Sequence, residues 1–444
     1  MAPGSPWRQP PNEREQHDDG GDKPRVASIP LALCSAAMID SGRTVMMLFT
    51  PQGREDPYPL YAQLREMAPV LRSPFGGWLL TRYETIDRVL RSPAFRTPRG
   101  FREANDPAGP PRMDPAGKLT LHRRHWLLFQ SGDAHTRLRK LIMKVFTPRA
   151  VRALTPRIEG LVADLLKPVL ARGSMEVITD LAYPLPATVI CELLGIPEED
   201  RERNRRWAAV TAATVDLQTC SDAQLAVAET AMGEWDAYIR ELLAARRKQP
   251  GTALLDDMLA VEEEGFRLTE DEIAANATFL FLAGHETTTN LVGNGLLALL
   301  RHPQQLAALY ATPELVENAV EELLRFDSPV QIAPRVALEP VEVEGAQIDR
   351  ELVIALILGS ANRDPRRYDR PDELDVTRPD PKPLSFGGGA HYCVGAALAR
   401  LEAKHAFAAL IASTRGLELA TERVSWKPSL GLRGLESLPV TLHL

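Results

Sequence analysis

The segment from Thr269 to His302 constrains the fold more than any other part of the chain, because it predicts one long, uninterrupted helix. Thr269 and Glu272 have the spacing of a capping box, in which two side chains satisfy free backbone N–H groups of the first turn. No proline follows until Pro303, which predicts a helix of about 33 residues, or roughly 50 Å at 1.5 Å per residue. Both ends of the segment are apolar on all sides, as is typical of a helix that passes through a protein core.

The centre of this helix is polar and reads AGHETTTN from Ala283 to Asn290. Burying such a cluster is costly unless each polar group finds a partner. A zinc site of the H-E-x-x-H type is excluded, because Thr289 stands where the second histidine would be. Two compatible interpretations remain. In the first, the Thr287 hydroxyl bonds back to the Ala283 carbonyl and bends the helix. In the second, Gly284 lets a flat ligand lie against the backbone.

The rest of the chain predicts a mostly α protein with a minor sheet. Helical patterns extend from Ala134 to Arg325, with breaks at four prolines, Pro148, Pro184, Pro197 and Pro250. Strand-like runs flank the Gly76–Gly77 turn and recur in VEVEGAQI and in the C-terminal LPVTLHL. The sequence contains no internal repeat and no linker that would divide it.

Two segments differ from this pattern in composition. Residues 1–45 are rich in proline, glycine and charged residues and predict a mostly disordered extension, with Met46 and Met47 as alternative start positions. Residues 46–444 are then expected to form a single domain. Residues 97–120 are dense in proline and glycine and too long for a simple connection, so we expect this loop to border a binding cavity.

Composition excludes several classes of protein. Hydrophobic residues make up 44% of the 444 residues, and the net charge of −7 argues against nucleic acid as a main partner. The apolar run at residues 29–39 is far shorter than the ~20 residues of a membrane helix, so we expect no membrane anchor. The cysteines are far apart and form no C-x-x-C pair, which indicates a reducing cytoplasm rather than disulfides or structural zinc: Cys34, Cys191, Cys220 and Cys393.

A second motif, SFGGGAHYCVG from Ser385 to Gly395, places Cys393 directly before a predicted helix. Free N–H groups and the helix dipole stabilise a thiolate there, and thiolates bind metals. The glycines allow a tight turn that aims backbone donors at the sulfur. Three other interpretations compete: a small buried hydrophobic residue, a phosphate loop that lacks its lysine, and a nucleophile paired with His391.

The spacing of Phe386, Gly389, His391, Cys393 and Gly395 closely resembles the heme-binding loop of the cytochrome P450 family. The resemblance covers the chain from about Asp56 to Leu444. It implies heme b as the cofactor and Cys393 as the axial ligand of its iron. The segment AGHETT, beginning at Ala283 and Gly284, is similar to the oxygen-binding turn of the same family.

Further residues match the family one by one. Glu322 and Arg325 of EELLR correspond to its E-x-x-R pair and are expected to lock their helix to the segment that holds the heme loop. Many relatives have an arginine where this chain has Glu373, which leaves Arg363 and Arg378 as candidates for a third partner. The resemblance also implies that four residues bind the heme propionates: His135, Arg139, Arg335 and His391. Asp133 departs from the family, since proline is common there.

The resemblance implies monooxygenase chemistry with O2, in which Thr287 delivers protons and Glu286 links Thr287 to solvent. No flavin, nicotinamide or iron–sulfur motif is present, so electrons are expected to come from outside the chain. The resemblance implies a ferredoxin and a ferredoxin reductase as their source. Exposed cations form either a ferredoxin site or an ordinary solvated face: Lys140, Lys144 and Arg149.

We expect a monomer with a hydrophobic substrate, bound between loop 97–120, the region 207–225, the oxygen-binding turn, SPVQIAP and SLGLRGL. The alternatives are a heme-thiolate peroxygenase or rearrangement enzyme and a heme-binding sensor or carrier.

Overall fold

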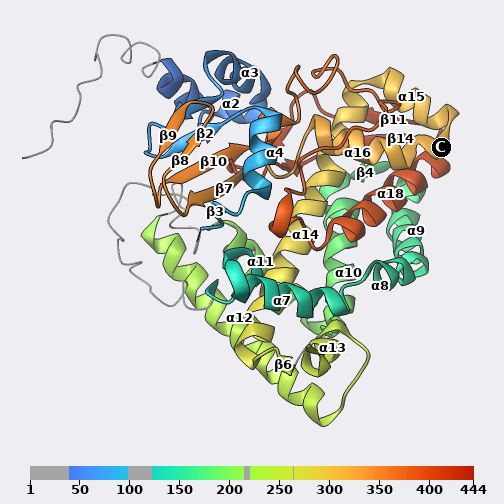
Figure 1. The fold of residues 1–444 in the computed structure, drawn as a ribbon. Helices are drawn as coiled ribbons and strands as arrows, with labels where there is room; N and C mark the ends of the chain where they lie inside the picture. The colour runs from blue at the N-terminus through green and yellow to red at the C-terminus, as the bar shows by residue number, and fades with distance from the viewer. Residues whose placement is uncertain (1–39, 99–122, 215–220, 264) are drawn as a thin grey trace, which may run out of the picture.

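The computed structural model describes residues 40–98, 123–214, 221–263 and 265–444. Its architecture is mostly α with small sheets, as the sequence predicts (Figure 1). The α-helices are α2 (Pro51–Glu55), α3 (Tyr58–Met67), α4 (Tyr83–Arg91), α7 (Gly132–Val145), α8 (Pro148–Ala153), α9 (Thr155–Arg172), α10 (Pro184–Leu194), α11 (Arg201–Ala212), α12 (Asp222–Lys248), α13 (Leu254–Ala260), α14 (Glu270–Arg301), α15 (Pro303–Ala311), α16 (Val316–Phe326), α17 (Leu358–Ala361) and α18 (Ala396–Ser413). The short helical turns are η1 (Leu127–Phe129), η2 (Ile178–Ala182), η3 (Glu198–Asp200), η5 (Pro313–Leu315) and η6 (Gly389–His391).

Helix α14 passes through the centre of the molecule, with α10, α12, α16 and α18 packed around it (Figure 1). The predicted capping box is present: the Thr269 hydroxyl accepts a hydrogen bond from the Glu272 N–H, and the Glu272 carboxylate accepts one from the Thr269 N–H. Both flanks of α14 are buried in the largest hydrophobic core, which contains Phe281, Leu291 and Leu296. The helix is therefore stabilised by packing on nearly all sides, as its sequence indicates.

The main sheet joins segments from both ends of the chain. Its strand order is β1 (Val70–Arg72), β2 (Trp78–Leu80), β10 (Val353–Ile357), β7 (Ile332–Ala337) and β3 (Phe95–Arg96). Strand β10 pairs in parallel with β2, placing Ala355 opposite Leu79, so N-terminal and C-terminal strands lie side by side in Figure 1. The strands around Gly76 were predicted, whereas β7 and β10 were not.

The remaining strands form smaller sheets. A three-stranded sheet has the order β11 (Gly416–Leu419), β14 (Pro439–His443) and β4 (Ser174–Glu176). Three pairs complete the set: β12 (Ser425–Trp426) with β13 (Leu435–Ser437), β5 (Glu262–Glu263) with β6 (Phe266–Arg267), and β8 (Val341–Val343) with β9 (Ala346–Ile348). The hairpin of β8 and β9 and the strand β14 confirm the predictions for VEVEGAQI and LPVTLHL.

The start of the folded part differs from the prediction. Residues 40–47 are helical, and Ser41, Thr44 and Val45 are buried, so the folded part of the chain begins before residue 46. Residues 1–39 of the predicted extension lie outside the described residues, as do residues 99–122 of the predicted loop. Pro168 lies inside α9, while α8 and α10 begin at the predicted breaks, Pro148 and Pro184.

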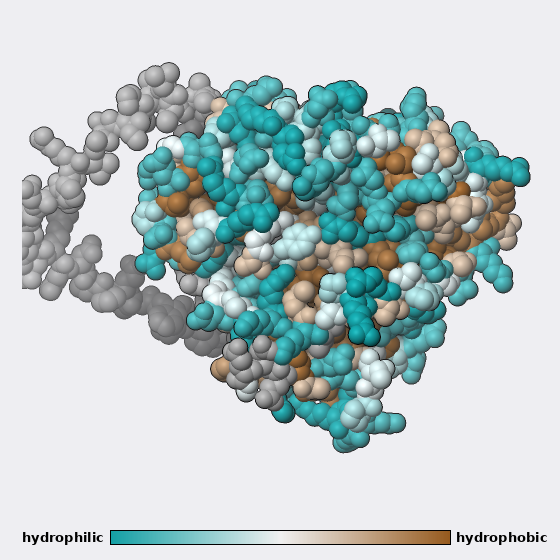
Figure 2. Space-filling view, turned by 45° about the vertical axis from the view of Figure 1, so that its right-hand side comes forward, coloured by the Kyte–Doolittle hydropathy of each residue, from teal (hydrophilic) through white to brown (hydrophobic). Residues whose placement is uncertain are grey.

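The surface in Figure 2 is mainly hydrophilic, with hydrophobic side chains in small groups between polar ones. In the part of the chain that the structure describes, no helix combines the length and the apolar character needed to cross a membrane.

Candidate active site

A cavity of about 540 Å³ lies between α14, the main sheet and the segment that precedes α18. Residues of the α14 centre line one side of it, including Ala283, Gly284, Glu286 and Thr287. The predicted cysteine loop also lines it, through Phe386, His391, Cys393 and Gly395. The structure thus brings together two motifs that are far apart in the sequence.

The polar centre of α14 satisfies most of its hydrogen bonds within the helix. The Thr287 hydroxyl donates to the Ala283 carbonyl at 2.9 Å, as predicted, and Thr289 donates to the His285 carbonyl at 2.8 Å. The His285 ring Nδ1 lies 2.8 Å from the Phe281 carbonyl. Helix α14 remains α-helical through this region, so these bonds cause no break in the helix.

Gly284 lines the cavity, but a side chain at this position would point toward Ile190 of α10, with its Cβ 3.4 Å from the Ile190 side chain. Close packing of two helices is therefore one reason for a small residue here. Contact between a flat ligand and the backbone at Gly284 stays a prediction.

The loop before α18 is folded by glycines that adopt positive φ angles. Gly387 has φ +70° and Gly389 has φ +63°, in the left-handed region that favours glycine. A side chain at Gly389 would overlap the Leu90 carbonyl of α4, so the loop packs directly on that helix. The Cys393 N–H donates to the Phe386 carbonyl at 3.0 Å, which closes the turn around the cysteine.

Cys393 is exposed and lies on the wall of the cavity. Burial raises the pKa of this thiol, while the N–H groups of Gly395 and Ala396 and the charge of Arg139 lower it. Helix α18 begins at Ala396, so the sulfur lies at its N-terminal end, where a thiolate is stabilised. A sulfur held by two backbone donors and facing a cavity fits an axial metal ligand.

The four residues expected to bind propionates lie close together. The rings of His135 and His391 are 4.0 Å apart, and Arg139, Arg335 and His391 line the cavity. Arg139 donates to the Tyr392 carbonyl at 2.7 Å, and Arg335 donates to the Pro334 carbonyl at 2.9 Å.

This group of basic residues has no acidic partner among the described residues. Within the described residues, neither guanidinium pairs with a carboxylate, and the buried His135 Nε2 has no hydrogen-bond partner. Burial and the positive charges of His135, Arg335 and Arg139 lower the pKa of His391 to about 3, and burial and Arg139 lower that of His135 to about 4. Burial also lowers the pKa of Arg335 to about 10. A ligand with two carboxylates would supply the missing negative charge, so the residues present fit heme.

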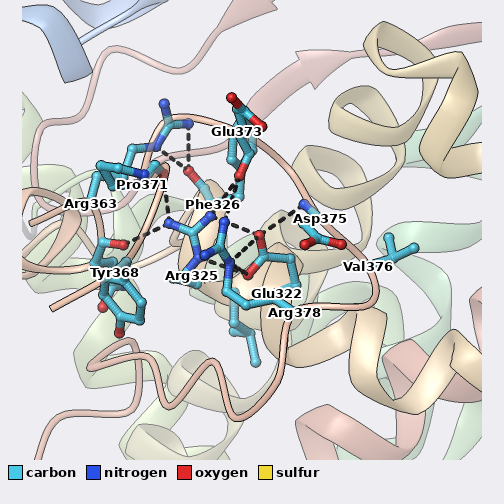
Figure 3. A network of polar contacts seen from close by, with 12 residues as sticks. Glu322, Arg325, Phe326, Arg363, Tyr368, Pro371, Glu373, Asp375, Val376 and Arg378 are labelled. Atoms are coloured by element: carbon cyan, nitrogen blue, oxygen red, sulfur yellow. Dashed lines mark hydrogen bonds and ion pairs between the residues drawn. The ribbon is translucent and has the colours of Figure 1, made fainter. Parts of the chain in front are cut away.

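The predicted Glu322–Arg325 pair is fully buried and forms the centre of a polar network (Figure 3). Arg325 donates two hydrogen bonds of 2.7 Å to the Glu322 carboxylate. It also donates to the carbonyls of Asn362, Pro371 and Glu373 at 2.7–3.0 Å. As the resemblance implies, this pair joins α16 to the segment that leads to the cysteine loop.

Of the two candidates for a third partner, the structure selects Arg378. Its Nε lies 3.1 Å from both oxygens of Glu322 (Figure 3). Arg363 instead donates to the Phe326 carbonyl and lies over the Tyr58 ring, so it does not contact Glu322. The Glu373 side chain points away from the pair and bonds Arg370, while its backbone carbonyl accepts from Arg325 and Arg378.

The expected walls of the substrate pocket line the cavity in part. They contribute Pro98, Ala212, the segment from Pro329 to Pro334, and the segment from Leu430 to Leu432. Residues 99–120 and 215–220 of the expected walls lie outside the described residues, and Trp207 packs in the core on Trp235 instead.

Two basic residues near this cavity were missed. Arg400 of α18 lies 4.4 Å from the centre of the Phe386 ring and pairs with Glu321. Lys427 pairs with Glu286 at 2.7 Å across 141 residues of sequence. No local sequence pattern could have identified the second contact.

Comparisons with known proteins agree with this geometry. The cytochrome P450 family model matches residues 100–312 and 310–415. "Cytochrome P450 monooxygenase PikC" of Streptomyces venezuelae is 39% identical over 395 residues, covering 87% of this chain and 91% of that protein. "Vitamin D(3) 25-hydroxylase" of Pseudonocardia autotrophica is 39% identical over 420 residues, covering 91% of this chain and 98% of that protein.

A solved structure is similar over the same extent. The crystal structure of P450BioI in complex with hexadec-9Z-enoic acid ligated acyl carrier protein has a TM-score of 0.83 and 37% identity. The match covers 88% of this chain and 100% of that one. This chain therefore belongs to the cytochrome P450 family of oxidoreductases, whose cofactor is heme b.

Proposed function

We propose that this cytochrome P450 is a monooxygenase that inserts one oxygen atom of O2 into a hydrophobic small molecule, by hydroxylation or epoxidation, in secondary metabolism. The observation that carries the proposal is the placement of Cys393 and Thr287 on the wall of one largely apolar cavity. Cys393 and the basic residues around Arg335 and His391 would hold heme b, which would supply the activation of O2, and a thiolate ligand favours cleavage of the O–O bond.

Within this proposal the chain's own residues supply protons and exclude water. The Thr287 hydroxyl donates to the Ala283 carbonyl, which leaves its oxygen free to accept a hydrogen bond from a protonated Glu286 or from a water molecule. Glu286, the neighbouring residue, is the sole carboxylate among the described residues that line the cavity. We assign to it the transfer of protons from solvent to Thr287.

The substrate class is inferred from the lining of the cavity. Apart from the α14 centre and the proposed heme contacts, most lining residues are apolar, including Phe279, Leu280, Ile332 and Leu430. Such a wall favours a hydrophobic ligand, because apolar surface is removed from water on both sides. The compounds named for two similar proteins, vitamin D(3) and hexadec-9Z-enoic acid, are of this kind and are suitable probes.

Electrons are proposed to come from a ferredoxin and its reductase, with the protein acting as a cytoplasmic monomer. Lys140, Lys144 and Arg149 are exposed on α7 and α8, and Arg139 of the same α7 contacts the Tyr392 carbonyl next to Cys393. A positive surface so close to the cysteine suits an acidic electron donor.

The first test is spectroscopic and concerns Cys393 as the ligand of the heme iron. The ferrous carbon monoxide complex should show the red-shifted Soret band of thiolate ligation, and Cys393→Ser should abolish that band. At least one of the two probes should shift the ferric spin state by displacing water from iron. A histidine-type band from the folded parent protein would exclude the assignment of Cys393.

The second test separates a monooxygenase from a peroxygenase, a rearrangement enzyme or a sensor. Thr287→Ala should keep heme but divert most of the electrons from NADPH, supplied through ferredoxin and its reductase, into hydrogen peroxide. Thr289→Ala is the matched control, because Thr289 makes the same bond to its helix but does not line the cavity. Equal product per NADPH in Thr287→Ala and the parent would refute the proton role of Thr287.

A further inference from the structure

Lys427, which follows β12, brings a positive charge to the polar centre of α14. Its Nζ lies 2.7 Å from Glu286 Oε1 and 3.4 Å from Asn290 Oδ1. Glu286 and Asn290 are four residues apart on α14, so they lie on the same face of the helix. The backbone packs tightly at this contact, since a side chain at Gly434 would overlap the Asn290 amide.

The ion pair of Lys427 and Glu286 reaches from the cavity to the outside. Glu286 lines the cavity and its side chain is 15% exposed. Lys427 does not line the cavity, yet its side chain is 28% exposed, so its accessible surface faces solvent. Together the two side chains cross the wall of the cavity in a single contact.

Lys427 differs from the basic residues that line the cavity in having a carboxylate as its partner. The two arginines that line the cavity bond to backbone carbonyls, Arg139 to Tyr392 and Arg335 to Pro334. In the described part of the chain, Lys427 is thus the cation that forms an ion pair with a carboxylate of the cavity wall. Removing one partner of a largely buried ion pair leaves the other without its contact, so the position of Glu286 depends on Lys427.

We propose that Lys427 is the positioning residue of a proton inlet: it holds Glu286 between cavity and solvent, so that protons reach Thr287 through Glu286. The inference rests on the proposed function, in which Glu286 and Thr287 carry protons. In each cycle the Glu286 carboxylate takes a proton from a hydronium ion of the solvent: an O–H bond of the hydronium breaks, water is left behind, and an O–H bond forms on Glu286. Glu286 then passes this proton on toward Thr287 and becomes a carboxylate again. The ion pair is then in its starting state.

A purely structural role predicts different behaviour. If Lys427 only tied the segment after β12 to α14, its loss would lower stability without changing how electrons are used. The pair of Lys404 and Glu317, 2.6 Å apart, offers a control for the loss of an ion pair away from the cavity.

The experiment compares heme-loaded Lys427→Met, Lys427→Arg, Lys404→Met and Glu286→Gln, with hexadec-9Z-enoic acid as the probe. We expect Lys427→Met to raise the hydrogen peroxide released per NADPH about threefold or more, because transfer of a proton from a positioned group contributes a large factor to the rate. The solvent deuterium isotope effect on NADPH oxidation should increase for the same reason. Lys427→Arg should restore most of the parental yield, and Lys404→Met should match the parent. Thermal unfolding adds a readout independent of activity: the effects of Lys427→Met and Glu286→Gln on the unfolding midpoint should be non-additive, because they remove the same pair.

The outcomes separate the two proposals. Parental peroxide yield in Glu286→Gln would refute the proton relay itself. Raised peroxide in Glu286→Gln together with parental yield in Lys427→Met would refute the role of Lys427 and leave the relay intact. An effect of Lys427→Met that persists undiminished in the Glu286→Gln background would also refute the inference, because Lys427 would then act through another group.

Discussion

Replacing Arg378 with methionine should destabilise the protein strongly, because Arg378 completes a buried charge network. It donates to both oxygens of Glu322 at 3.1 Å and to the carbonyls of Asp369, Arg370 and Glu373 at 2.7–3.2 Å. Methionine has a similar length but no donor. The substitution therefore removes the bonds while filling much of the space.

The loss in the free energy of unfolding depends on the hydrogen bonds that Glu322 retains in the variant. Breaking a buried ion pair by removing one partner costs about 3–5 kcal/mol. Glu322 retains both bonds from Arg325 and the N–H of Asp375 at 3.0 Å, which places the loss at the lower end, about 3 kcal/mol. Such a loss is a large fraction of the total stability of a typical domain.

The assay is equilibrium unfolding in denaturant, followed by circular dichroism and by heme absorbance, with a double-mutant cycle against Glu322→Gln. Arg378 and Glu322 should be coupled by about 1.5–3 kcal/mol, the range for a hydrogen bond to a charged group. Arg363 does not contact Glu322, so its methionine variant should be additive with Glu322→Gln within about 0.5 kcal/mol.

Arg370→Met is the control, since its side chain is 59% exposed and makes surface ion pairs only. If Arg378→Met were no less stable than Arg370→Met, or if Arg363 rather than Arg378 were coupled to Glu322, the reasoning from the buried network would fail.

Three further predictions concern other parts of the molecule. Glu402 is buried and has no charged partner among the described residues, and its burial raises its pKa well above 4.5. The folded state therefore retains a proton and loses stability as pH rises. In thermal unfolding, Glu402→Gln should exceed the parent midpoint by a few degrees at pH 8 but barely at pH 5, and an equal difference at both pH values would contradict this. Gly389→Ala should cost about 1–3 kcal/mol in denaturant unfolding through its positive φ and its overlap with Leu90, and clearly more than Gly132→Ala, which has φ +60° in open space. Arg335→Leu should speed heme loss to excess apomyoglobin about tenfold, because it removes a charge-assisted bond to a heme carboxylate, and an unchanged rate would exclude Arg335 from heme binding.

Local signals were sufficient for some of the individual elements. The capping box at Thr269 and the proline at Pro303 predicted α14 to within a residue at each end, because helix ends depend on neighbouring residues. The spacing of the cysteine loop identified Cys393 for the same reason, since its turn is built from consecutive residues. The strands β7 and β10 were missed although VIALI is a short apolar run rich in β-branched residues, because such a run does not by itself distinguish a strand from a helix.

The sequence by itself therefore determined the long central helix, the cysteine loop and the family to which they belong. Only the tertiary structure decided which arginine joins Glu322, that β10 pairs with β2, and that Lys427 reaches Glu286. These contacts join residues far apart in the chain, and their formation depends on how whole helices and sheets pack. Spacing along a sequence carries no information about that packing until the segments meet in three dimensions.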